Sequence, residues 1–449
     1  MSKRNITDFF NEEYVNFASY DNYRSIPHVV DGLKPTARKV IYTVLEQNIN
    51  ELKKVDTLKS KVADFTQYLH GEEAIVAVIV GLGQNFVGTN NIPLLKKDGN
   101  FGTRLVPAPA AGRYIKSCKI SYFTSMFCSD DDPILIEQNF EGEKIEPKYY
   151  VPTLPLLLVN GSASALSVAF TSNILPRNIK DIVDRIYLLL EGKEIERFYP
   201  WFQGFNGIVT INEKGSVETR GIFTKVGPKE ITITELPIGF SLSKYREVLE
   251  KLEEKKIIQS WRDESNTRND TYKFRVKLNK VIPDDKIYDL LKLVNREAEN
   301  FTCIDENNKI KVFENECEIL KKYVEVKLQY YQKRKEYIIS ELEREIRILR
   351  NKLRFLGVVL SGKVVIFKKP RLEIEKQLEE NSIERIDDSY DYLLRMQIDQ
   401  LTEEKVESLI RQFDTKKGEL NIIKQKDIKD WWRSDIQKLL EQLKPKRSS

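Results

Sequence analysis

Histidine and cysteine are too sparse in this chain to build several common kinds of site. Only two of the 449 residues are histidines, His28 and His70, which excludes a histidine-rich metal site. The four cysteines show no Cys-x-x-Cys spacing, so we expect reduced thiols in a cytosolic setting. The chain has no run of about 18 apolar residues and no apolar signal core at its N-terminus, which predicts a cytoplasmic protein without a membrane helix.

Acidic residues are missing from residues 99–129, although 31% of the chain is charged and the net charge is only +5. At the centre of this stretch, PAPAAGRYIKS (107–117) places Arg113 next to Tyr114. An isolated Arg-Tyr pair is most often a packed ring beside a surface charge, but the missing acids favour a surface that binds phosphates. The cationic residues of the stretch are Arg104, Arg113, Lys116 and Lys119.

Three other patterns match functional motifs only in part. GVVLSGKV (357–364) resembles a phosphate-binding loop, but it has Val364 in place of the metal-binding hydroxyl and follows a long helix. The consecutive aspartates 130–132 cannot all face one ion, so we expect a solvated loop there. The pair Trp431-Trp432 lies in a late helical segment, which favours packing over base stacking.

The chain is too long for one ordinary core, and its pattern changes twice along its length. Residues 1–147 mix short helical patterns with tight turns, residues 148–312 combine β-rich runs with helices, and residues 313–449 are mainly helical. We therefore expect a multidomain α+β protein with these three regions as domains.

In the first region, a turn signal at 31–32 precedes a helix that begins at Pro35. Further helices are expected over 55–69 and 72–85, followed by a turn-centred wing at 91–106. This order predicts a helix-turn-helix with a wing.

In the second region we expect strands in GIVTI, GIFTKV and EITITEL, and helices over 244–256 and 284–298. In the third, Val324, Tyr331 and Ile338 recur every seven residues. Charged residues interrupt this spacing, which favours a pair of antiparallel helices over a long zipper. A second helical stretch is expected from about Tyr390, with Thr402 as a helix cap.

Ten segments in this order resemble the breakage-reunion module of type IIA DNA topoisomerases, over essentially the whole chain. They are DGLKPTARK (31–39), YLHGEEA (68–74), GQNFVGTNN (83–91), DGNFGTR (98–104), AAGRY (110–114), PTLPLLLVNG (152–161), YPWFQGFNG (199–207), ITELP (233–237), YYQKRKE (330–336) and YDYLLRMQIDQLTEEK (390–405). The residues of these segments are more similar to those of the eukaryotic and viral enzymes than to those of the A subunit of bacterial gyrase. The viral enzymes include the medium subunit of T-even-type bacteriophages. The resemblance implies a winged-helix domain, a tower domain, and a coiled-coil arm that ends in a dimer gate.

The resemblance also implies roles for individual residues. It makes Tyr114 the nucleophile that stores the energy of the broken DNA strand as a phosphotyrosyl bond, and it places Arg113 beside the developing charge. It places Arg38 and His70 at the phosphate that is cleaved. Because the pKa of free tyrosine is about 10, the site must assist its deprotonation. The residues expected to contact DNA are Arg24, Lys34, Lys39, Arg104, Lys116 and Leu166.

The chain departs from the family pattern at two places. Tyr68-Leu69-His70 stands where the family often has paired histidines, so one histidine carries their role. The segment 159–178 is one residue longer than usual, so either Leu166 or Ala165 occupies the position of the apolar wedge that bends DNA.

In the family, the ATPase and the metal-binding carboxylates lie N-terminal to this module, and here Met1 stands only a few residues before it. We therefore expect one subunit of a split enzyme, whose partner binds ATP and most of the Mg²⁺ ligands, with no metal site in this chain. A core fragment of a fused enzyme is the alternative. We further expect a homodimer through the C-terminal gate, a heterotetramer or larger assembly with the partner, and a viral or phage origin with function in the host cytoplasm.

Two other classes of protein compete with an ATP-dependent type II topoisomerase that cleaves duplex DNA. A tyrosine recombinase also uses tyrosine and arginine, but neither His28 nor His70 provides the His-x-x-Arg motif that this class needs upstream of its tyrosine. A non-catalytic coiled-coil protein that bridges DNA would explain the helices and the basic stretch. It gives no reason for Arg113-Tyr114 on an acid-free loop.

Overall fold

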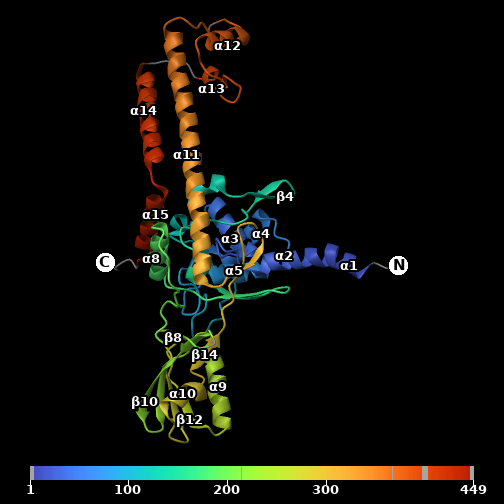
Figure 1. The fold of residues 1–449 in the computed structure, drawn as a ribbon, viewed down its shortest axis with the longest axis vertical. Helices are drawn as coiled ribbons and strands as arrows, with labels where there is room; N and C mark the ends of the chain where they lie inside the picture. The colour runs from blue at the N-terminus through green and yellow to red at the C-terminus, as the bar shows by residue number, and fades with distance from the viewer. Residues whose placement is uncertain (1–4, 214, 367, 397–402, 445–449) are drawn as a thin grey trace. The chain divides into compact units, whose positions relative to one another are not determined.

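The computed structural model describes residues 5–213, 215–366, 368–396 and 403–444 (Figure 1). The chain divides into two compact units, one formed by the residues up to Lys327 together with those from Arg433, and the other by Leu328–Trp432. Both helices and sheets are present, as the α+β prediction requires. No helix in the described ranges is long and apolar enough to cross a membrane.

Three helices form the centre of the first unit: α3 (Pro35–Glu46), α4 (Val55–Phe65) and α5 (Glu73–Gly83). Pro35 begins α3 because the first N–H of a helix has no partner inside the helix. Helix α4 is shorter than the predicted 55–69. It ends at Phe65 because Gln67 adopts a left-handed φ of 50°, so His70 lies in a turn beyond the helix.

A three-stranded antiparallel sheet has the order β1 (Lys53–Lys54), β3 (Lys116–Lys119) and β2 (Leu95–Asp98), of which only β2 lies in the segment 91–106 where a wing was predicted. Strands β2 and β3 pair directly, with Lys97 opposite Ser117, so the sheet holds both ends of residues 99–115. The first part of the acid-free stretch, residues 99–115, therefore forms a long loop between two paired strands.

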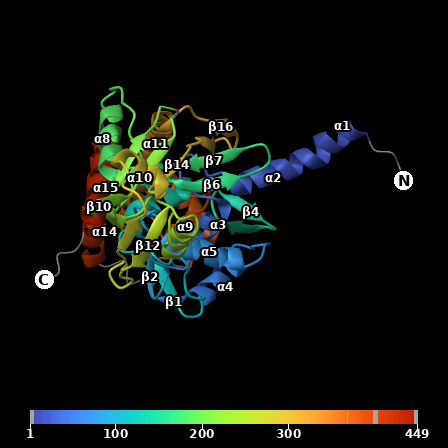
Figure 2. The same ribbon diagram turned by 90° about the horizontal axis from the view of Figure 1, so that it is seen from below.

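Two further helices of the first unit lead into α3. Helices α1 (Ile6–Asp8) and α2 (Val15–Ser25), joined by the π-helical segment η1 (Phe9–Tyr14), extend away from the other elements of their unit in both views (Figures 1 and 2). The last turns of α2 are hydrogen-bonded to the rest of the unit through Tyr20, Asp21 and Asn22.

The remaining elements around this centre are short. They are α6 (Phe123–Met126), the 3-10 helix η2 (Ser129–Ile134), the hairpin β4 (Gln138–Phe140) and β5 (Glu143–Ile145), α7 (Leu156–Asn160), the hairpin β6 (Ser162–Leu166) and β7 (Thr171–Ile174), α8 (Ile179–Leu190), and the pair β15 (Thr302–Ile304) and β16 (Ile310–Val312). The solvated loop expected at the aspartates is only partly correct, since Asp130 and Asp132 in η2 are exposed. Asp131 is buried, and its carboxylate lies 3.6 Å from the buried ammonium group of Lys327.

Residues 208–297 contain two antiparallel sheets with two helices. The four-stranded sheet has the order β10 (Ile222–Gly227), β11 (Glu230–Glu235), β13 (Phe274–Leu278) and β12 (Ile258–Asp263). The three-stranded sheet has the order β14 (Val294–Glu297), β9 (Val217–Arg220) and β8 (Ile208–Ile211). One face of the four-stranded sheet packs its apolar side chains against α9 (Leu242–Glu254) and α10 (Asp284–Leu290).

The helix predicted over 284–298 is only half correct. It ends at Leu290, and residues 294–297 pair as strand β14 with β9. Lys292 adopts a left-handed φ of 54°, which ends the helical backbone before β14 begins.

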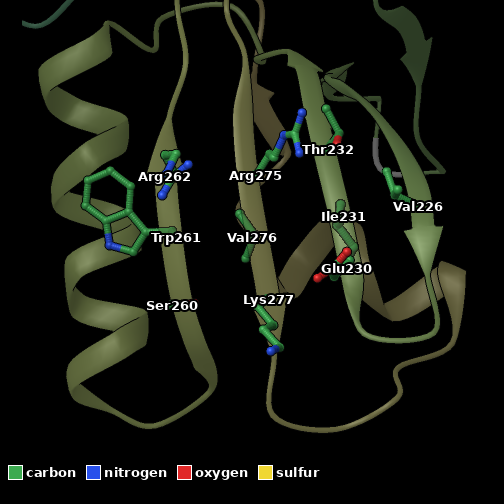
Figure 3. A pocket seen from close by; sticks show the side chains of 10 residues that line it. All are labelled: Val226, Glu230, Ile231, Thr232, Ser260, Trp261, Arg262, Arg275, Val276 and Lys277. Atoms are coloured by element: carbon green, nitrogen blue, oxygen red, sulfur yellow. The ribbon is translucent and has the colours of Figure 1, made fainter.

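The other face of the four-stranded sheet is polar and open (Figure 3). It carries a hollow of about 330 Å³ in which Arg262 on β12 lies directly opposite Arg275 on β13. Glu264 lies 3.0 Å from Arg275 and offsets part of this positive charge.

Helix α11 (Glu316–Leu360) begins in the first unit and continues into the second. Within the second unit, Glu345 pairs with Lys416 and Glu343 with Lys424. From the first of these ion pairs to the second, the residue number decreases along α11 and increases along α14 (Glu403–Gln425). The two helices therefore run antiparallel, as the interrupted seven-residue spacing favoured.

The same unit contains α12 (Arg371–Glu380) and α13 (Asp391–Leu394), and helix α15 (Ile428–Leu443) follows α14. Tyr331 stacks against Trp432, which confirms that this tryptophan packs in the interior. Val364 is also buried, in a small core after the end of α11. The predicted cap Thr402 and most of the expected gate segment, residues 397–402, lie outside the described residues.

Candidate active site

Tyr114 stands near the end of the loop between β2 and β3, and 69% of its surface is exposed. Its backbone N–H donates to the carbonyl of Ala111 at 2.9 Å, which closes a tight turn. The next residue, Ile115, is fully buried, and its carbonyl accepts from the N–H of Val55 at 3.0 Å. The phenol is therefore presented to solvent by a backbone that is fixed on both sides.

Arg113 accompanies Tyr114 on the exposed side of the loop. Its guanidinium carbon lies 5.0 Å from the centroid of the Tyr114 ring, within the range of a cation–π contact. No hydrogen bond or ion pair to Arg113 is found among the described residues. Its five N–H donors are thus available for an anion that approaches the tyrosine oxygen.

Gly112 allows this turn to lie against the start of α4. A Cβ at this position would overlap the carboxylate of Asp56 in the first turn of that helix. A larger residue at position 112 would therefore require the Asp56 side chain to move.

Arg104, which the sequence suggested as a DNA contact, lies nearer the middle of the same loop and is buried rather than exposed. It is 7% exposed, its guanidinium lies 2.5 Å from Glu235, and its carbonyl accepts from the hydroxyl of Tyr272. The carboxylate of Asp270 accepts from the N–H groups of Arg104 and Leu105 at 3.0 and 3.1 Å. Because its charge is balanced inside the protein, Arg104 is better suited to anchor the loop than to bind a phosphate.

Arg38 on α3 is also buried, with 2% of its surface exposed. Its Nε and Nη2 donate to the carboxylate of Asp31 at 2.7 and 3.3 Å, and Nη2 also donates to the carbonyl of Leu33. Burial alone would lower the pKa of Arg38, but the Asp31 carboxylate raises it above its usual value. In this structure the guanidinium is held in the interior rather than at an open phosphate surface.

Lys39, the neighbour of Arg38, holds the turn that leads to His70. Its ammonium group donates to the carbonyl of Thr66 at 2.8 Å and to the buried carboxylate of Glu146 at 2.9 Å. Burial raises the pKa of Glu146, and the charge of Lys39 opposes this effect. Most of the Lys39 side chain is covered, so its first role is to fix the end of α4.

His70 accepts or donates a hydrogen bond with Tyr20 on α2, across 2.7 Å between Nε2 and the phenol oxygen. Partial burial lowers the pKa of His70, and the positive charges of Arg24 and Lys39 lower it further. The ring is therefore mainly neutral near pH 7. The other histidine, His28, is buried against Tyr149 and takes no part in this surface.

Three of the cations predicted to contact DNA have no ion pair with a described residue. Arg24 is exposed at the end of α2, and Lys116 is exposed on β3. Lys34 precedes α3, and burial lowers its pKa. Arg24 and Lys34 both line a hollow of about 370 Å³ that also borders Gly161.

The two candidates for the apolar wedge differ sharply in exposure. Leu166 is 81% exposed at the end of β6, whereas Ala165 is 4% exposed and packs against Ile26 and Ile304. Only an exposed side chain can enter a stack of bases, so the structure favours Leu166. The turn that follows is held by Asp21, whose carboxylate accepts from Ser167 Oγ at 2.7 Å.

The predicted catalytic residues thus fall into two groups. Arg113 and Tyr114 share one loop, while Arg38 and His70 belong to the region around α3 and the end of α4. Within the described part of the chain, no hydrogen bond, ion pair or ring contact joins the two groups. Nor do the described residues include a group of three or more His, Cys, Asp or Glu that could hold a metal ion.

A family model for the A subunits of DNA gyrase and topoisomerase IV matches residues 24–437. The chain belongs to this family. It is 35% identical over 453 residues to the mitochondrial DNA topoisomerase 2 of Dictyostelium discoideum, covering 97% of this chain and 35% of that protein. It is 33% identical to DNA topoisomerase 2 of Plasmodium falciparum, covering 98% of this chain and 34% of that protein. The chain thus spans about a third of the length of these relatives.

The fold is also shared with a solved structure of the family. The crystal structure of the Plasmodium falciparum topoisomerase II DNA-binding, cleavage and re-ligation domain matches with a TM-score of 0.86 and 33% identity, covering 97% of this chain and 64% of that chain. The resemblance carried by the ten sequence segments is therefore confirmed.

Sequence reasoning missed the residues that position the catalytic candidates. Asp31 was interpreted only as part of a turn, and Gly32 does adopt a φ of 68°, but the Asp31 carboxylate also holds Arg38. Tyr20, Glu146 and Asp270 carried no signal, because each meets its partner only through the tertiary fold.

Proposed function

We propose that this chain carries out the DNA breakage-reunion step of a type IIA topoisomerase. The observation that supports this most directly is the exposed Tyr114 beside Arg113 on an ordered loop without acids. Membership of the family of DNA gyrase and topoisomerase IV A subunits supports the same step.

In the proposed reaction, the phenol oxygen of Tyr114 attacks a phosphorus atom of the DNA backbone. A tyrosyl P–O bond forms as one DNA P–O ester bond breaks, and the departing DNA oxygen gains the proton that the phenol loses. The reverse attack by this DNA hydroxyl restores the strand and frees the tyrosine. Arg113 stabilises the additional negative charge on phosphorus while both bonds are partial.

The elements have distinct roles in this proposal. Helices α3–α5 with the sheet β1-β3-β2 act as a winged helix that presents the nucleophile. Residues 208–297 act as the tower, and Leu166 enters the base stack and bends the duplex. Helices α11 and α14 form the arm, whose far end would provide the dimer gate.

The full cycle needs groups beyond those described. We propose that two copies of the chain cut the two strands in a staggered manner, so that a second duplex can pass. The similar topoisomerases are about three times as long as the matched segment, so ATP hydrolysis and the carboxylates that bind Mg²⁺ belong to sequence outside it. We propose that a partner polypeptide carries this sequence, and the alternative is that it belongs to the same polypeptide as this segment. Mg²⁺, when bound there, would supply further charge stabilisation at the reacting phosphate.

Covalent trapping tests the proposal. Supercoiled DNA is incubated with the chain, Mg²⁺ and the partner, and the reaction is stopped with detergent. The wild type should leave protein attached to both ends of a staggered break, and Tyr114→Phe should leave none while it still binds DNA. Adducts formed by Tyr114→Phe would show that another residue is the nucleophile.

The same assay separates the two alternatives. A tyrosine recombinase would leave adducts on single-strand nicks within a specific sequence. A non-catalytic protein that bridges DNA would bind duplexes and leave no adduct under any condition.

A further inference from the structure

Tyr20 makes a hydrogen bond with the ring of His70. Among the described residues, the ring has no other hydrogen bond. The hydroxyl of Tyr20 lies 2.7 Å from Nε2 of His70, and the two rings are 6.2 Å apart. Tyr20 is 52% exposed, and Leu69, next to His70, is 73% exposed. The pair lies at the surface, so core packing does not force the contact, and the hydrogen bond itself holds the imidazole.

The groups around the pair limit what the imidazole can do. Arg24 lies with its guanidinium carbon 5.6 Å from the centroid of the Tyr20 ring, and Tyr68 meets the imidazole edge-on at 5.5 Å. The charged groups that act on His70 are Arg24 and Lys39, and both disfavour its protonated form. A neutral imidazole has a single N–H, on either Nδ1 or Nε2.

We propose that Tyr20 is a positioning residue for His70: its hydroxyl donates to Nε2, which places the ring proton on Nδ1 as the donor for a phosphate oxygen of bound DNA. The opposite tautomer would use its only N–H on the Tyr20 oxygen and leave the lone pair of Nδ1 facing an anion. The phosphate contact rests on the proposed function, whereas the tautomer is a property of the free chain.

This role accounts for a departure in the sequence. Leu69 stands where the family often has another histidine, and its side chain cannot hydrogen-bond. Tyr20 reaches the remaining histidine from a different element, α2, and restores a polar contact that the local sequence lacks.

The chain is well suited to a direct test, since it has only two histidines. Histidine labelled with ¹⁵N in the full-length chain should give two pairs of ring-nitrogen signals, with His28 as an internal reference. In the wild type, His70 should show a protonated Nδ1 and an unprotonated, hydrogen-bonded Nε2. Tyr20→Phe should mix the two His70 tautomers and leave the His28 signals unchanged.

Tyr14→Phe is the matched control, because it makes the same chemical change on the preceding segment, where the Tyr14 ring lies against Phe9 and Phe10. It should leave both histidines unchanged. If Tyr20→Phe also leaves the His70 ring nitrogens unchanged, or if wild-type His70 carries its proton on Nε2, the proposal is overturned whether or not the chain cleaves DNA.

A second arm tests the phosphate contact. A saturating short duplex should shift the Nδ1 signal of wild-type His70 and not the signals of His28, and an unmoved His70 would refute the phosphate role. In the trapping assay, Tyr20→Phe should slow adduct formation by about twofold to tenfold, the range expected for one neutral hydrogen bond, with unchanged DNA affinity. Wild-type chains that form no adduct would reject the proposed function, while the ring-nitrogen signals still decide the role of Tyr20.

Discussion

At the scale of single residues, Arg113 differs from Arg38 and Arg104 in having no hydrogen-bond or ion-pair partner among the described residues. Arg113→Lys keeps the charge but loses the planar fork that can hold two phosphate oxygens. We expect adduct formation to slow by about a hundredfold, or roughly 3 kcal/mol, because a contact made in the transition state is lost. DNA affinity, measured by filter binding, should change little. A rate within about twofold of wild type would contradict the role given to Arg113.

Leu166 and Ala165 are neighbours with opposite surroundings, which makes them a matched pair. Leu166→Ala should reduce DNA bending, measured by energy transfer between dyes at the duplex ends, and reduce cleavage with it. Affinity should keep its salt dependence, because the phosphate contacts come from cations. Ala165→Gly removes a small buried side chain and should affect stability more than bending. If Ala165→Gly abolishes bending instead, the wedge has been assigned to the wrong residue.

Individual side chains also show where sequence reasoning reaches its limit. The exposure of Tyr114 and Arg113 followed from a stretch without acids, since a cation with no nearby carboxylate tends to face solvent. Arg104 belongs to the same stretch and yet is buried, because Glu235 and Asp270 approach it from segments more than 130 residues away. No local pattern reports such a partner, so the charge alone could not distinguish an anchor from a DNA contact.

At the scale of elements, the turn that carries Tyr114 depends on its close approach to α4. Gly112→Ala would bring a methyl group onto the Asp56 carboxylate, so the Asp56 side chain rotates away or the loop shifts slightly. We expect cleavage to fall by about twofold to tenfold, since even small displacements of a reacting group are costly, while duplex binding is kept. Gly357→Ala is the control, because a Cβ at this position in α11 meets nothing within 4 Å. It should leave cleavage unchanged, and equal losses in both variants would refute the argument.

In the four-stranded sheet, Arg262 and Arg275 are directly opposite each other on neighbouring strands. Like charges in this position destabilise a sheet, so Arg262→Thr should stabilise the protein by about 0.2–1 kcal/mol. Thermal unfolding at low salt provides the measurement. Ser260→Thr on the same strand, opposite Lys277, should have a smaller effect. A lower unfolding temperature for Arg262→Thr would show that the arginine makes a favourable contact instead.

Elements with one clear periodicity were predictable, and elements with mixed signals were not. The helix from Pro35 had both a start signal and a consistent apolar face. Residues 284–298 keep a helical apolar spacing at Ile287, Leu291 and Val294 but carry no signal for the end of the helix, so the pairing of β14 with β9 could not be predicted. The seven-residue spacing of α11 indicated a partner helix but could not identify which one.

At the scale of the whole molecule, stability should depend on a buried carboxylate at the start of α11. Glu316 is 1% exposed and accepts from Arg197 at 3.0 Å and from the N–H of Phe198 at 3.0 Å. Burial alone would raise its pKa, but these donors together with Arg177 lower it below the usual value. A lowered folded-state pKa gives a contribution that is present above the unfolded pKa of about 4.3 and is lost as the pH falls through the folded value.

Glu316→Gln should therefore lower the free energy of unfolding by roughly 3 kcal/mol at neutral pH. The difference from wild type should shrink as the pH falls below about 4, where wild-type Glu316 also becomes protonated. Urea denaturation at several pH values provides the measurement. Glu314→Gln, two residues earlier and exposed, should stay within about 0.5 kcal/mol of wild type at every pH. If the loss of unfolding free energy in Glu316→Gln does not depend on pH, Glu316 stabilises the protein through packing rather than through its charge.

The anchors of the loop between β2 and β3 have a consequence for the entropy of substrate binding. Asp270 and Glu235 hold the loop near its middle, and Gly112 and Ile115 hold its end, so one long loop behaves as two short ones. The conformational freedom of the segment is lost when the protein folds and not when DNA arrives. The nucleophile is therefore preorganised, and more of the DNA-binding energy remains to bend the duplex and to stabilise the transition state.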